Sequence, residues 1–119
     1  MNFEHILVLC SCPDPAVAER IAAALVDEGL AACVNRVGDV RSTYVWEGRR
    51  VDEPEVLLFV KTVARRYREV ELRLKALHPY EVPEIIALPI VAGSASYLAW
   101  MAAATRRPGD PAPMHAPQL

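Results

Sequence analysis

Two prolines, Pro79 and Pro83, set the point at which one helix must end and one strand must begin. Proline has no backbone N–H and a fixed φ, so a helix that precedes Pro79 should stop at or near His78. Pro83 comes just before the apolar run 85–91, which indicates a strand. Polar groups held on a stiff turn beside a strand often form a site. The turn carries His78, Tyr80, Glu81 and Glu84.

Hydrophobic periodicity divides the rest of the chain into alternating strands and helices. The apolar run that ends at Cys10 indicates a buried strand, and Asp14–Pro15 is a typical helix start. Gly29 is a natural helix stop, and Glu47–Arg50 reads as a hairpin turn. The expected strands are 5–12, 31–46, 55–61 and 85–91, and the second of them is broken at Gly38–Asp39. The expected helices are 15–28, 64–77 and 94–103.

The element order βαββαβ with a terminal helix predicts an α+β fold, the ferredoxin-like split-βαβ plait. Helices then cover one face of an antiparallel sheet. Because the second and third strands are long, we expect oligomerisation to cover the other face. We expect one domain over residues 1–104. Residues 105–119 are rich in proline and lack periodicity, so this tail is expected to be disordered.

Composition excludes several classes of protein. The formal net charge is −2, which gives no electrostatic case for nucleic acid binding. No apolar run approaches the roughly 20 residues of a membrane helix, and the N-terminus lacks the basic start of a signal peptide. We therefore expect a cytoplasmic protein whose 3 cysteines are thiols. No nucleophile motif or His-x-x-x-His pair occurs, so an enzyme is not expected.

Taken together, several motifs resemble the CutA divalent-cation-tolerance family. They lie in register over about residues 5–103, at 9–14, 30–35, 42–48, 55–62, 78–85 and 97–100. The resemblance implies a homotrimer of ferredoxin-like subunits, similar in build to the trimeric PII signalling proteins. It also implies a role in heavy-metal tolerance and the binding of divalent metal ions, Cu²⁺ above all, with Zn²⁺ as the other candidate.

The resemblance assigns metal-ligand roles to Cys10 and His78. Thiolate and imidazole are both ligands for copper and zinc. Some members carry a second histidine directly before this one, where the present chain has Leu77. We hypothesise that Cys12, two residues beyond Cys10, offers a second sulfur instead. The alternatives are that the thiols, Cys33 included, are buried packing residues and that His78 is a helix-end cation.

The other function class considered is a PII-like regulatory module, in which a cleft between subunits binds a small anionic effector. Lys61 lies on the same strand face as Glu55. Lysine at the end of an apolar strand needs a carboxylate partner, which Glu84 or Glu81 could supply. The alternative is that Lys61 forms a structural ion pair with a carboxylate of another subunit. Aromatic residues would line the cleft, although packing between the subunits of a trimer is the favoured alternative for them. The candidate effector residues are Lys61, Glu55, Tyr44, Trp46, Tyr80, Glu84 and Trp100.

Overall fold

A four-stranded antiparallel sheet with the strand order β2-β3-β1-β4 forms the centre of the fold. The computed structural model describes residues 3–111 of the chain. The strands are β1 (His5–Cys12), β2 (Cys33–Trp46), β3 (Arg49–Val63) and β4 (Ile86–Pro89). The helices are α1 (Pro15–Asp27), a 3-10 turn (Ala64–Arg66), α2 (Tyr67–Leu77) and α3 (Ala95–Ala104). The predicted order βαββαβ with a terminal helix is confirmed.

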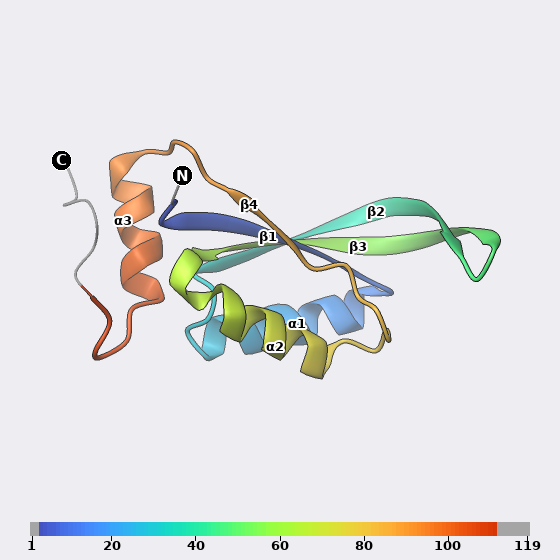
Figure 1. Cartoon of the computed structure of the whole chain (residues 1–119), viewed down its shortest axis with the longest axis horizontal. Coiled ribbons are helices and arrows are strands. Elements are labelled where there is room, and N and C mark those ends of the chain that lie inside the picture. The colour runs from blue at the N-terminus through green and yellow to red at the C-terminus, as the bar shows by residue number, and fades with distance from the viewer. Residues whose placement is uncertain (1–2, 112–119) are drawn as a thin grey trace.

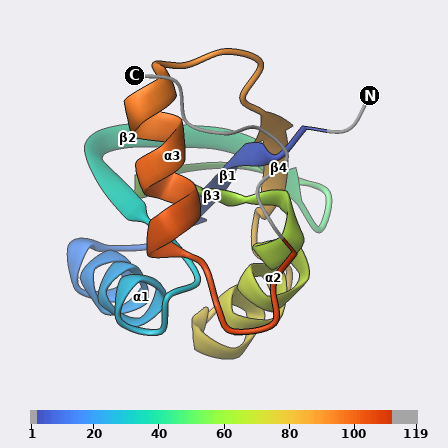
Figure 2. The same ribbon diagram turned by 90° about the vertical axis from the view of Figure 1, so that its left-hand side faces the viewer.

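Helices α1 and α2 lie side by side on one face of the sheet, and α3 stands across its end (Figures 1 and 2). Alternation along β1 and β3 turns one set of side chains toward α1 and α2. Full burial of each large apolar side chain contributes roughly 1.5–3 kcal/mol. The largest buried members of this core are Val8, Ile21, Leu25, Leu58, Val60, Val70 and Leu74. None of the described helices has the length and apolarity needed to cross a membrane.

Strands β2 and β3 form a long hairpin that projects beyond the helices (Figure 1). Its turn consists of Glu47 and Gly48, which both have positive φ, at 52° and 79°. Two such residues are typical of the tight turns whose twist matches that of a hairpin. The predicted break at Gly38–Asp39 is a bulge between Val37 and Val40 inside a continuous strand.

The structure corrects four predicted element boundaries. Strand β3 begins at Arg49 and not at residue 55, because Pro54 pairs with β2 while its other edge has no strand partner among residues 3–111. A proline is tolerated where its missing N–H is not needed by the ladder. Strand β4 is shorter than the expected 85–91, β2 begins at Cys33, and the first turn expected for α2 is a 3-10 turn.

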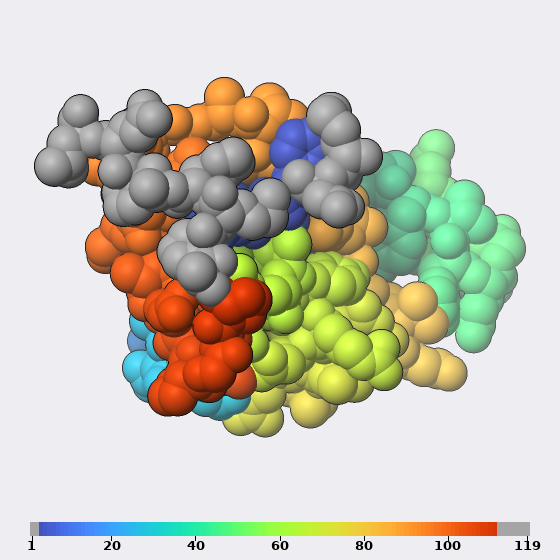
Figure 3. All heavy atoms as spheres, turned by 60° about the vertical axis from the view of Figure 1, so that its left-hand side comes forward, coloured from blue at the N-terminus to red at the C-terminus, as the bar shows by residue number. Residues whose placement is uncertain are grey.

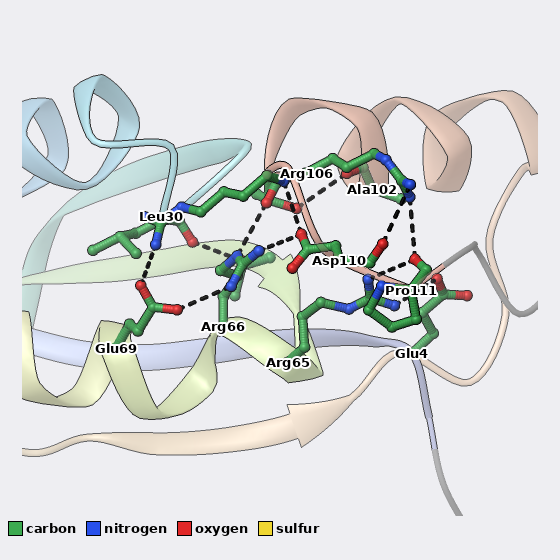
Figure 4. Close-up of polar contacts among 12 residues, drawn as sticks. Glu4, Leu30, Arg65, Arg66, Glu69, Ala102, Arg106, Asp110 and Pro111 are labelled. Carbon is green, nitrogen blue, oxygen red and sulfur yellow. Dashed lines mark hydrogen bonds and ion pairs between the residues drawn. The ribbon is translucent and has the colours of Figure 1, made fainter.

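Residues 105–111, expected to belong to a disordered tail, contact the body of the protein (Figures 3 and 4). Thr105 is buried, and its hydroxyl donates to the carbonyl of Met101 over 2.9 Å. The guanidinium of Arg66 pairs with both Asp110 and Glu69 and donates to the carbonyl of Thr105. The remainder of the expected tail, residues 112–119, lies outside the described residues, and the predicted domain boundary remains a prediction.

Candidate metal centre

The end of β1 and the end of α2 bring together three side chains of types that ligate metals. Cys10 and Cys12 are two residues apart on one strand, so both point to the helix-covered face. His78 is the C-cap of α2, and its N–H donates to the carbonyl of Leu74. The two sulfur atoms and an imidazole nitrogen all lie within 4.8 Å of one another. All three side chains are buried, with exposed fractions of 0%, 0% and 7%.

Both ring nitrogens of His78 already have hydrogen-bond partners. Nε2 lies 2.7 Å from the carbonyl oxygen of Ser11, and Nδ1 lies 3.1 Å from the backbone nitrogen of Tyr80. A carbonyl can only accept and a peptide N–H can only donate. The ring is therefore the neutral tautomer that carries its proton on Nε2 and accepts at Nδ1.

The two thiols influence each other, which shifts their pKa values in opposite directions. A hydrogen bond between the side chains raises the pKa of Cys10, as do burial and the nearby carboxylates of Glu84 and Glu55. The same bond lowers the pKa of Cys12, against the opposing effect of burial. The Cys10 thiol also lies 4.0 Å from the carbonyl oxygen of Ser11, to which it donates. Thiolate is the form of cysteine that binds metals.

The donor set of two sulfurs and one imidazole nitrogen fits copper or zinc. Bonds of about 2.0–2.3 Å to an ion held among three such donors place the donors roughly 4 Å apart, which the observed cluster accommodates. Leu77, the neighbour of His78, is half-buried against the core and supplies no ligand. Among the described residues, the cluster thus contains Cys10, Cys12 and His78 and no carboxylate.

Two of the predicted effector residues, Tyr80 and Glu55, meet at the root of the hairpin. The hydroxyl of Tyr80 donates to a carboxylate oxygen of Glu55 over 2.9 Å, and Glu55 is buried with an exposed fraction of 6%. Burial and this bond raise the pKa of Tyr80. Tyr44 is close enough for its charge to contribute to that shift, but its hydroxyl donates to Glu53 over 3.2 Å. Glu84 is exposed.

The other predicted effector residues lie elsewhere in the subunit. The Nζ of Lys61 is 5.7 Å from the ring centroid of Tyr97, at the α3 end of the sheet. Trp100 packs on the same tyrosine, with ring centroids 5.5 Å apart. Six residues of strand, about 20 Å, separate Lys61 from Glu55. Trp46 ends β2 at the far end of the hairpin. One subunit does not gather these side chains, and the cleft between subunits remains a prediction.

Sequence reasoning missed the partners that position these groups. Ser11 contributes its backbone carbonyl to His78, Glu53 accepts from Tyr44, and Tyr97 lies under Lys61. A backbone carbonyl carries no residue-specific signal. Contacts between residues 11 and 78 depend on tertiary packing, so no local spacing could have identified them.

Comparisons with known proteins find relatives in both sequence and fold. The family model described as "CutA1 divalent ion tolerance protein" matches residues 6–104. The divalent-cation tolerance protein CutA of Thermus thermophilus is 50% identical over 95 residues, which are 80% of this chain and 92% of that protein. The crystal structure of CutA1 from Shewanella sp. SIB1 has a TM-score of 0.87 at 38% identity and covers 90% of this chain and 100% of that one.

A third relative bears on the compartment. The structure of the periplasmic divalent cation tolerance protein CutA from Archaeoglobus fulgidus has a TM-score of 0.84 at 35% identity. It covers 86% of this chain and 99% of that chain. Because this relative is described as periplasmic, the cytoplasmic location expected from the sequence remains a prediction.

Proposed function

The chain belongs to the CutA1 divalent ion tolerance protein family, and from this premise we propose that it binds copper or zinc through Cys10, Cys12 and His78. The observation that carries the proposal is the buried cluster of two sulfurs and an imidazole nitrogen within 4.8 Å. The family consists of tolerance proteins and not of enzymes, in agreement with the expectation from the sequence. We propose that capture of the ion is the chain's contribution to metal tolerance.

Each of the three side chains has a role in this proposal. Cys10 and Cys12 provide two charged donors once their thiol protons are released to solvent. His78 contributes a neutral nitrogen. This increases the preference for copper or zinc over Ca²⁺ or Mg²⁺, which select oxygen ligands. Burial excludes competing water and brings the negative charge of two thiolates into a site where a divalent cation neutralises it. The bound ion would neutralise the thiolates and would not take part in a chemical reaction.

Self-association as a homotrimer is part of the proposal, and apolar exposure supports it. The hairpin, β4, the segment after β4 and α3 present large apolar side chains to solvent in the single chain, a pattern that marks protein interaction surfaces. These side chains are Val37, Tyr44, Val45, Trp46, Ile86, Leu88, Val91, Tyr97 and Trp100.

A calorimetric titration of the reduced protein tests the metal site. Zn²⁺ is the first probe because it has no redox chemistry, whereas Cu²⁺ oxidises thiols. We expect one ion bound per chain in the wild type and in Cys33→Ala, whose thiol lies outside the cluster. Binding should be lost in Cys10→Ala. Equal binding by wild type and Cys10→Ala, or no binding by either, would refute the proposed site.

A further inference from the structure

We infer that a metal ion bound through His78 releases the backbone N–H of Tyr80, so that occupation of the metal site is transmitted to the turn 79–83 and to Glu55. The inference rests on the proposed metal site. It starts from the hydrogen bond in which Tyr80 N–H donates to Nδ1 of His78 over 3.1 Å.

The release follows whichever ring nitrogen coordinates the ion. If Nδ1 binds the metal, its lone pair is used and Tyr80 loses its acceptor. If Nε2 binds, the proton on Nε2 is displaced and the neutral ring takes up a proton on Nδ1. That Nδ1–H then faces the N–H of Tyr80, and two donors cannot pair. Neither arrangement keeps the bond.

The two arrangements differ only in the fate of Ser11. Coordination through Nδ1 leaves the Nε2–H bond to the Ser11 carbonyl intact, which is the usual outer support of a metal-binding histidine. Coordination through Nε2 breaks that bond as well. The ring gains and loses no net proton in either case, and the protons released on binding come from the thiols.

Tyr80 connects this bond to the hairpin. Its ring packs on the imidazole of His78, with centroids 4.7 Å apart, and its hydroxyl donates to Glu55 on β3 over 2.9 Å. Glu55 and Tyr80 are also two of the residues predicted to line the effector cleft. The metal site and the predicted cleft therefore share one hydrogen-bonded chain, from His78 through Tyr80 to Glu55. By linkage, if metal binding weakens a contact that holds Tyr80 in its metal-free position, that contact weakens metal binding by the same factor.

Hydrogen exchange of the Tyr80 amide, followed by NMR on the full chain with and without saturating Zn²⁺, tests the inference. In the metal-free wild type the amide is protected by His78, and zinc should accelerate its exchange by about tenfold or more. In His78→Gln the acceptor ring is absent, so exchange should be insensitive to zinc. The amide of Val60, in the centre of β3, serves as the internal reference.

The outcomes separate the two proposals. Zinc binding that requires Cys10 and Cys12 but leaves Tyr80 exchange unchanged overturns this inference and retains the proposed metal site. Absence of zinc binding by the wild type overturns both. Acceleration at Tyr80 in wild type, absent in His78→Gln and with Val60 unchanged, supports the inference.

Discussion

The hydroxyl of Tyr80 lies 2.9 Å from a carboxylate oxygen of Glu55, and this bond joins the turn after α2 to the root of the β2–β3 hairpin. Glu55 is buried, so its carboxylate depends on this donor in place of water. A second tyrosine–glutamate bond, from Tyr44 to Glu53, lies nearby on the exposed part of the hairpin. These two bonds allow a comparison of the same tyrosine–glutamate hydrogen bond in a buried and an exposed position.

Tyr80→Phe should lower the free energy of unfolding by about 1.5–3 kcal/mol, because it leaves a buried carboxylate without its donor. Tyr44→Phe removes the same atom from an exposed bond and should change that free energy by less than about 0.5 kcal/mol. Urea unfolding followed by circular dichroism measures both. Equal losses in the two variants would show that burial of Glu55 does not govern the value of the bond.

Asp110→Asn should lower stability in a manner that depends on pH. The hydrogen bond from Arg66 lowers the pKa of the Asp110 carboxyl, with a further contribution from the Arg107 N–H. A depressed pKa in the folded state stabilises the protein above the unfolded pKa of about 3.9, and this stabilisation is lost as pH falls through the folded pKa. The urea midpoints of wild type and variant should differ most near neutral pH and converge below about pH 4. A constant gap over that range would contradict the assignment.

Cys12→Ala should weaken zinc binding by about tenfold or more, since even the outer supports of a metal site are worth 10–100-fold in affinity. The substitution tests whether the second sulfur takes part where Leu77 supplies no ligand. Calorimetry of the reduced variant beside Cys33→Ala gives the comparison. Unchanged affinity in Cys12→Ala would assign this thiol to packing alone.

Ile86→Lys should disrupt the proposed trimer, because it places a charge on exposed apolar β4, where the side chain is 52% exposed in the single chain. Leu72→Lys is the matched control, since Leu72 is similarly exposed at 57% but lies on α2. Sedimentation should give three times the subunit mass for wild type and Leu72→Lys, and a smaller mass for Ile86→Lys. A wild-type mass of one subunit would remove the trimer from the proposal.

Much of the local structure could be predicted from sequence because its causes are local. The Asp14 side chain caps α1 and Pro15 begins it, as their residue types require. Pro79 follows the end of α2 at Leu77, and apolar alternation predicts the strand segments. The start of β3 was misplaced because Pro54 is compatible with a strand only when one side lacks a partner, and that is a property of the sheet.

The sequence by itself determined the element order, the family and the candidate donor atoms, because periodicity, capping residues and motif spacing are properties of neighbouring residues. Only the tertiary structure decided that His78 meets the two thiols, that its ring nitrogens are held by Ser11 and Tyr80, and that Lys61 lies over the ring of Tyr97. These relationships arise when α2 packs on the sheet and the strands pair in register. They depend on contacts between residues distant in the chain, which local chemistry does not specify.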